Sequence, residues 1–227
     1  MRVPSKIQLL INAFLKYILG VLMVALMLFL SAGTLSYSNA WLFLAVLFVP
    51  MFLFGVWLFV ANPSLLASRL NNKEKRQEQR HVVALSGIIF VSVFVLCGLD
   101  YRYEWSQVPR WVVYAASVLL LLGYALYMEV MRENTYLSRT IEVQDGQQLI
   151  DTGLYAIVRH PMYSATIIMY LAIPLVLGSF WALLLMSFYP FLIVKRIQNE
   201  EQLLVQELPG YSEYQKRVKY KIIPGIW

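Results

Sequence analysis

The chain has 227 residues, of which 59% are apolar and only 14% are charged. A mean hydropathy of +0.61 excludes an ordinary soluble domain and predicts an integral membrane protein. The formal net charge of +6 is typical of basic cytoplasmic loops, so we expect a lipid bilayer as a partner and no nucleic acid.

The first part of the chain predicts two membrane spans. No residue from position 17 to position 68 is charged, and this stretch is far too long for a signal peptide. Because about 20 helical residues cross the hydrocarbon, we expect helices at 9–30 and 41–60. The small and polar residues at 31–40 predict the turn between them.

A polar and mostly basic segment at 62–81 comes next, and we interpret it as a solvated loop that faces the cytoplasm. Two further spans are expected at 82–99 and 111–131, joined by a short polar link. After them, residues 132–161 form the longest polar insertion in the chain.

The uncharged stretch at 162–194 is too long for one ordinary span. We expect Pro174 and the pair Gly178-Ser179 to break it into two arms of about 16 residues, each ~24 Å long as a helix. These arms predict a short hairpin, which a polar tail follows. The expected fold class is therefore an all-α, polytopic transmembrane helical bundle with about five to six crossings, the C-terminal hairpin included.

The composition divides the chain into two expected parts, four N-terminal spans at 1–131 and a C-terminal region at 132–227. With six crossings and both termini in the cytoplasm, 17 of the 19 Lys and Arg residues lie on the cytoplasmic side. Only Arg102 and Arg110 then lie on the other side. This asymmetry favours a multi-pass protein with both termini, and any site built from the polar insertion and the tail, in the cytoplasm.

The sequence Arg159-His160-Pro161 stands at the start of the apolar hairpin. Because proline suits the first helical turn, we expect a helix to begin here with His160 near the N-cap. The free N–H groups of that turn form an anion site, to which Arg159 adds a fork suited to a carboxylate or phosphate. A phenol and two small side chains, which let a ligand approach the backbone, follow: Tyr163, Ser164 and Ala165. An ordinary helix start with a snorkelling arginine fits the same residues.

A second polar group, KRIQNEEQLL, follows the hairpin directly. On a helix, Arg196 and Glu200 lie four residues apart and form either a surface salt bridge or part of a site. In the second case Arg196 holds an anion, and Glu201 holds a cation or orients the arginine. The single cysteine and the two histidines are a poor metal set, so we expect no metal site.

The order TGLYAIVRHPMYSA, short apolar hairpin, EEQLL, LPGYSEYQKRV and IIPGIW resembles the isoprenylcysteine carboxyl methyltransferase family and related membrane phospholipid methyltransferases. The resemblance covers residues 133–227. It implies an S-adenosyl-L-methionine cofactor bound by the Arg-His-Pro segment and the two-glutamate helix. Two positions depart from the family, which usually has glycine at Ala165 and often has proline at Leu154.

On the matching positions, the resemblance implies a cofactor site and an acceptor site. His160, Pro161 and Tyr163 would line the cofactor site, and Glu200 and Glu201 would hold the polar groups of the cofactor. Arg159, Ser164 and Ala165, singled out above on their own chemistry, complete the expected cofactor-binding residues. Catalytic residues facing the acceptor would be Arg196 and Glu201. The resemblance also implies a lipophilic small-molecule or prenylated acceptor.

Methyl transfer from a sulfonium is an in-line displacement that needs proximity, alignment and a dry site. A carboxylate acceptor needs no general base, whereas a hydroxyl or amine acceptor needs a proton sink such as Glu201 or His160. Two alternatives stay open. One is a phospholipid amine N-methyltransferase, and the other is a non-catalytic membrane scaffold or a small transporter, for which charged groups at mid-membrane are expected.

Overall fold

The computed structural model describes residues 5–70, 77–138, 140, 142–144 and 146–227. In these residues it contains helices and no strand, which confirms the all-α fold class. The elements are α1 (Lys6–Ala32), α2 (Ser38–Ala61), α3 (Pro63–Leu70), α4 (Gln77–Tyr103), α5 (Arg110–Glu133), the 3-10 helix η1 (Gly153–Ala156), α6 (Pro161–Leu177), α7 (Phe180–Met186), α8 (Tyr189–Glu207) and α9 (Tyr211–Arg217).

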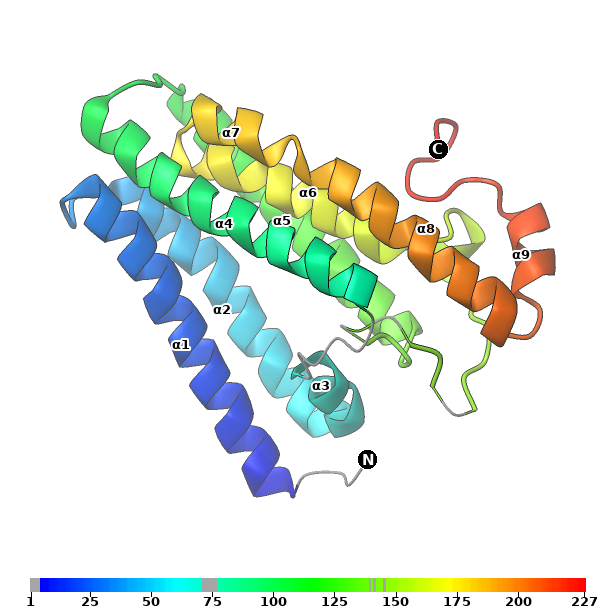
Figure 1. Ribbon diagram of the computed structural model, residues 1–227. Coiled ribbons are helices and arrows are strands. Elements are labelled where there is room, and N and C mark those ends of the chain that lie inside the picture. Colours follow the sequence, from blue (N-terminus) through cyan, green and yellow to red (C-terminus); the bar gives the residue numbers. More distant parts are fainter. Residues whose placement is uncertain (1–4, 71–76, 139, 141, 145) are drawn as a thin grey trace.

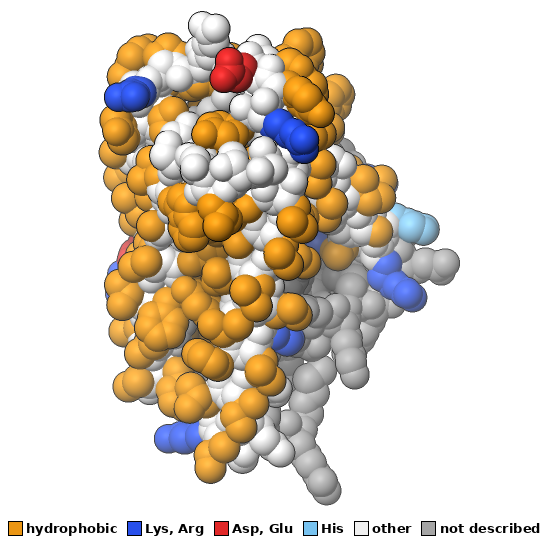
Figure 2. Space-filling view, turned by 90° about the vertical axis from the view of Figure 1, so that its left-hand side faces the viewer, with side chains coloured by type: hydrophobic (Ala, Val, Ile, Leu, Met, Phe, Trp, Pro, Cys, Tyr) orange, Lys and Arg blue, Asp and Glu red, His pale blue; other side chains and the backbone are white. Residues whose placement is uncertain are grey.

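Five segments of the described chain are helices long and apolar enough to cross a membrane. Four of them are α1, α2, α4 and α5, and the fifth is the α7–α8 pair, whereas α6 is shorter, with 17 residues. Hydrophobic side chains cover most of the face in Figure 2, and the few charged ones lie toward its edges. The chain is therefore an integral membrane protein.

The two ends of the bundle differ in what they carry. Figure 1 shows the α1–α2, α4–α5 and α6–α7 turns at one end of the molecule. The segment between α5 and α6, together with α3, α9 and the C-terminus, lies at the opposite end. We call this segment, residues 134–160, the linker. The polar insertion and the tail therefore meet at one end of the bundle, as the sequence predicts.

The C-terminal hairpin forms where the sequence places it, with two differences. Gly178 ends α6 in the left-handed region at φ 84°, and Ser179 begins α7 by accepting a hydrogen bond from Ala182 N at 3.0 Å. The prediction that Pro174 also breaks the helix was wrong, because Pro174 lies inside α6 and costs it a single backbone hydrogen bond. The second arm is longer than expected, since α8 continues to Glu207.

The expected loop after the second span contains a helix instead, α3. Asn62 accepts a hydrogen bond from Leu65 N at 3.1 Å, and Pro63 occupies the first helical position. Leu65 and Leu66 are buried, so this part of the segment is packed rather than solvated. The basic positions 73, 75 and 76 of the predicted loop, and Arg2 and Arg139, lie outside the described residues.

Close packing of α5 against α6 fixes the position of the candidate site. A Cβ atom at Gly123 of α5 would lie 2.7 Å from Met169 Cγ and 3.4 Å from Ala165 O of α6. Such small residues let two membrane helices approach closely. The start of α6, with the Arg-His-Pro motif, is therefore held against the end of α5, from which the linker departs.

Candidate active site

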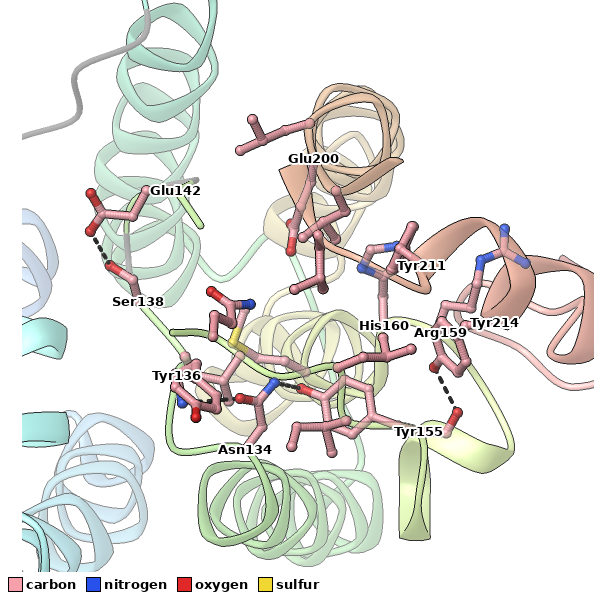
Figure 3. Close-up of a pocket in the computed structure, with 18 of the residues that line it drawn as sticks. Asn134, Tyr136, Ser138, Glu142, Tyr155, Arg159, His160, Glu200, Tyr211 and Tyr214 are labelled. Atoms are coloured by element: carbon pink, nitrogen blue, oxygen red, sulfur yellow. Dashed lines mark hydrogen bonds between the residues drawn. The ribbon is translucent and has the colours of Figure 1, made fainter. Parts of the chain in front are cut away.

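A hollow of about 830 Å³, its open mouth included, lies between the linker, the start of α6, α8 and α9. Figure 3 shows Asn134, Tyr136 and Tyr155 along one side of this cavity and Glu200 and Tyr211 along the other. The polar and aromatic lining residues are Asn134, Tyr136, Ser138, Thr140, Glu142, Gln147, Gln148, Tyr155, Arg159, His160, Tyr163, Arg196, Glu200, Tyr211 and Tyr214.

The Arg-His-Pro motif begins α6 as predicted, with His160 as the N-cap and Pro161 in the first turn. The backbone of the motif is paired with the tail of the chain. Arg159 N donates to Tyr220 O at 2.9 Å, and His160 N donates to Lys221 O at 2.8 Å. These two bonds tie the tail to the back of the motif, so the His160 ring keeps a fixed place in the cavity wall.

Arg159 does not present a free fork to the cavity. Its Nε donates to Glu201 Oε1 at 2.7 Å, and its Nη1 donates to the carbonyls of Val218 and Lys219 at 2.7 and 2.9 Å. The side chain is buried, and these three acceptors compensate its charge. The sequence predicts an open anion fork at Arg159, whereas in the structure its Nε and Nη1 already donate to these acceptors.

Glu201 lies behind the cavity wall instead of in it. Its Oε1 lies 3.2 Å from His160 Nε2, and its Oε2 accepts a hydrogen bond from Lys221 Nζ at 2.9 Å. Together with the Arg159 contact, these bonds gather the motif, α8 and the tail around one buried carboxylate. We call Arg159, Glu201 and Lys221 the tail latch. Its geometry lets Glu201 orient the His160 ring.

The second α8 glutamate and the arginine reach the cavity together. Arg196 Nε donates to the Tyr163 hydroxyl at 2.9 Å, and that hydroxyl donates to Glu200 Oε2 at 2.5 Å. All three side chains line the cavity. The sequence predicts a contact between Arg196 and Glu200 along the helix, and the structure places the Tyr163 hydroxyl between them.

Three predicted cofactor residues do not line the cavity. Ser164 Oγ donates to Ile222 O at 2.6 Å and holds the tail, and Ala165 is fully buried against α5. Pro161 is buried in the first turn of α6. The small side chains at 164 and 165 thus serve packing, and the structure shows no opening toward the cavity at either position.

A group of tyrosines in the cavity wall was missed by the sequence analysis. Asn134 Nδ2 donates to the Tyr155 hydroxyl at 2.9 Å, and the Tyr214 hydroxyl donates to Tyr155 O at 2.7 Å. The buried Tyr211 hydroxyl has no hydrogen-bond partner in the described part of the chain. Burial raises the pKa of all three tyrosines, so each remains a neutral phenol at neutral pH.

The sequence also did not predict that the linker forms one wall of the cavity. Tyr136 N donates to Asn134 Oδ1 at 3.0 Å, and Thr140 Oγ1 donates to Glu142 Oε1 at 3.1 Å. Ser138 Oγ lies 3.4 Å from the same carboxylate oxygen. Irregular segments have no hydrophobic period, and the only signal in the sequence was the unusual length of the polar insertion.

The family model "Isoprenylcysteine carboxyl methyltransferase (ICMT) family" matches residues 103–206, from the end of α4 almost to the end of α8. Delta(14)-sterol reductase TM7SF2 of Mus musculus is 35% identical over 91 residues, 39% of this chain, and the match spans about a fifth (22%) of that protein's length. The family match contains the Arg-His-Pro motif and both α8 glutamates, which confirms the resemblance that the sequence shows. Residues 103–206 of this membrane protein are therefore similar to the isoprenylcysteine carboxyl methyltransferase family, whose name states a methyltransferase activity.

Proposed function

We propose that the protein is an S-adenosyl-L-methionine-dependent methyltransferase that acts on a lipid-like or prenylated acceptor, with a carboxylate as the accepting group. The observation that carries the proposal is the cavity itself. His160, Tyr163, Arg196 and Glu200 line it within the family segment, and the cavity lies where the linker and α8 leave the membrane helices.

The lining residues fit this cofactor, which combines an adenosine, a carboxylate, an ammonium group and a sulfonium. Glu200 and Glu142 offer carboxylates to cationic groups, and Arg196 offers a guanidinium to an anion. The neutral tyrosines give flat apolar surfaces and hydroxyl groups to an aromatic base. The unpartnered Tyr211 hydroxyl is a donor with no acceptor among the described residues, and a bound ligand would supply one.

When bound, the cofactor supplies an activated methyl group, and the residues of this chain supply alignment. We propose that Arg196 holds an anionic acceptor by two parallel hydrogen bonds, with Tyr163 and Glu200 fixing the guanidinium. A carboxylate acceptor needs no base. For Glu201 we propose a positioning role, through the tail latch and His160, in place of direct contact with the acceptor.

We propose further that both termini and the cavity face the cytoplasm, and that residues 132–227 carry the cofactor site. The linker, α9 and the C-terminus lie at the same end of the bundle. Residues 1–131 then anchor this region in the bilayer. The acceptor is a molecule whose apolar part stays in lipid while its polar end reaches the cavity.

The partial similarity to a sterol reductase favours one competing function, hydride transfer from a nicotinamide dinucleotide. Such a ligand carries phosphates, which cationic side chains or free backbone N–H groups bind. Among the described lining residues, Arg159 is already bonded to Glu201 and two carbonyls, and Glu142 and Glu200 add negative charge. The cavity therefore favours a sulfonium cofactor over a dinucleotide. A phospholipid amine as acceptor is the second alternative, with His160 as the proton sink.

Calorimetry on the purified protein tests the proposal. We expect S-adenosyl-L-methionine to bind and NADPH not to bind. The His160→Ala variant should bind the cofactor about 10- to 150-fold more weakly, which corresponds to about 1.5–3 kcal/mol for a lost charged or buried hydrogen bond. Binding of NADPH without binding of S-adenosyl-L-methionine would overturn the proposed function. Carboxylate and amine acceptors are then compared by methyl incorporation.

A further inference from the structure

Helix α3 lies outside the segment that matches the family, yet it contacts the wall of the cavity. Residues 103–206 match the family, and α3 spans Pro63–Leu70 in the connection between the second and third membrane helices. Figure 1 shows α3 at the same end of the bundle as the linker. Its last turn faces the linker residues that form one side of the cavity.

Arg69 makes this contact with both arms of its guanidinium. Nη1 donates to Ser138 O at 2.9 Å and lies 3.9 Å from Met162 Sδ, while Nη2 donates to the Tyr127 hydroxyl. The guanidinium carbon lies 5.6 Å from the centre of the Tyr127 ring. Ser138 and Met162 both line the cavity, so one side chain joins the end of α5, the linker and the first turn of α6.

A second bond of α3 reaches the same stretch of linker. Ser68 Oγ lies 3.2 Å from Leu137 O and 2.8 Å from Leu65 O, so it bridges the linker and its own helix. Two consecutive carbonyls of the linker, those of Leu137 and Ser138, therefore face donors from α3. An irregular segment has no ladder of its own to satisfy its carbonyls. Arg69 satisfies that of Ser138, and the single Ser68 proton is shared between Leu137 O and Leu65 O.

Helix α3 is itself held rigidly from the membrane side. Leu65 and Leu66 pack in one buried cluster with Leu9 of α1, Leu58 of α2 and Met131 of α5. At the C-terminal end of α3, the Leu70 carbonyl accepts a hydrogen bond from the Lys16 ammonium of α1. The contacts of Arg69 thus connect the cavity wall to three membrane helices.

We propose that α3 braces the cavity, with Arg69 as a positioning residue that sets the linker wall in its ligand-binding place. The first two membrane helices thereby contribute to a site whose lining residues all come from the rest of the chain. The consequence for ligand affinity rests on the proposed function, because it requires S-adenosyl-L-methionine to bind in this cavity. The restraint on the linker does not depend on the ligand.

Hydrogen exchange tests the restraint without any ligand. The linker amides of Tyr136, Leu137 and Thr140 donate to Asn134 Oδ1, Asn134 O and Ser138 Oγ. In Arg69→Lys the charge stays but the fork is lost, so a peptide covering 134–144 should exchange at least tenfold faster. The amides of η1 should keep their rates. Arg132→Lys is the matched control, because Arg132 is exposed, lies at the same end of the bundle and bonds Glu129.

Cofactor titration tests the consequence. We expect Arg69→Lys to bind S-adenosyl-L-methionine about tenfold more weakly than the parent, and Arg132→Lys to bind it as the parent does. Unchanged exchange at 134–144 in folded Arg69→Lys overturns the brace, and faster exchange with unchanged affinity overturns the positioning role. If the parent itself does not bind the cofactor, the proposed function fails, and the exchange result alone decides whether α3 restrains the linker.

Discussion

Two arginines of the site have the same chemistry and different surroundings. Arg159 is buried, and the carboxylate of Glu201 and two backbone carbonyls accept its hydrogen bonds. Arg196 is half-buried, lines the cavity and donates to the Tyr163 hydroxyl. A buried guanidinium must keep its partners, because losing one leaves an uncompensated charge. Arg159 therefore supports the site, and Arg196 is the guanidinium that we expect to hold an acceptor.

At Arg196 we expect a loss of activity without a loss of cofactor affinity. Arg196→Lys keeps the charge but cannot form two parallel bonds to a carboxylate. Its kcat/KM should fall at least tenfold, or about 1.4 kcal/mol, while the affinity for S-adenosyl-L-methionine stays within about twofold. Calorimetry and methyl incorporation give the two values. A parallel fall in both would place Arg196 in the cofactor site.

At Tyr211 we expect the opposite pattern, a loss of affinity without a loss of stability. The hydroxyl is buried without a partner in the described chain, so Tyr211→Phe removes an uncompensated polar group and should leave stability unchanged or raised. If a ligand accepts this hydrogen bond, its affinity should fall by about tenfold, since a hydrogen bond contributes about 1 kcal/mol or more. Equal affinity in the two proteins would show that the hydroxyl does not meet the ligand.

Tyr214→Phe is the matched control for that measurement. The Tyr214 hydroxyl donates to Tyr155 O at 2.7 Å, so its loss leaves a buried carbonyl without this donor. We expect this variant to lose about 1–2 kcal/mol of unfolding free energy. Thermal unfolding in lipid discs compares the two phenylalanine variants directly.

At the scale of elements, polar clusters fasten the two ends of the bundle. At the end opposite the cavity, the buried carboxylate of Asp100 on α4 accepts bonds from Ser106 N and Ser106 Oγ, each at 2.7 Å, and from Ser179 Oγ at the start of α7. At the cavity end, the tail latch joins the motif, α8 and the tail. The Asp100 cluster joins the end of α4 to the start of α7, and the tail latch joins the start of α6, α8 and the tail.

For the tail latch, removing the carboxylate charge should release the tail. Glu201→Gln leaves Arg159 and Lys221 without their anion, and breaking a buried ion pair typically costs about 3–5 kcal/mol. We expect lower unfolding free energy and faster proteolysis within 218–227. Methyl transfer should fall in proportion to the folded fraction and to cofactor occupancy. A stable variant that binds the cofactor normally but does not turn over would instead assign Glu201 to the chemistry.

For the opposite end, Asp100→Ala leaves three donors without an acceptor. Since each unsatisfied buried donor costs about 1–3 kcal/mol, the variant should unfold at a clearly lower temperature. Ser187→Ala serves as the comparison, because the Ser187 hydroxyl is exposed and bonds Leu184 O within the same turn. If both variants unfold at the same temperature, the Asp100 cluster does not hold the α4 and α7 ends together.

At the scale of the whole molecule, the distribution of charge predicts the orientation in the bilayer. Reporter fusions after positions 72 and 227 should both report the cytoplasm, and a fusion after Ser36 should report the other side. In this orientation 17 of the 19 Lys and Arg residues lie on the cytoplasmic side of the membrane. A C-terminal reporter outside the cytoplasm, with position 72 inside it, would contradict the six-crossing arrangement, because it requires an odd number of crossings after position 72.

The sequence by itself determined the features that depend on local chemistry. Long uncharged stretches predict spans, Pro161 predicts the start of α6, and Gly178 its end. The Arg-His-Pro motif could also be read directly, because its three residues are adjacent in sequence. Asn62 and Pro63 begin α3 by the same kind of local chemistry, although the segment 62–81 was predicted as a loop from its charges.

Only the tertiary structure decided which side chains share the cavity. Glu200 and Glu201 are neighbours in sequence, yet one lines the cavity and the other is buried in the tail latch. Their directions depend on the rotation of α8 and on the tail that packs beside it. The partners of Arg159, the place of Tyr211 in the cavity wall and the contact of Arg69 with the linker all depend on segments distant in sequence. Such contacts follow from packing, which no periodic pattern in the chain encodes.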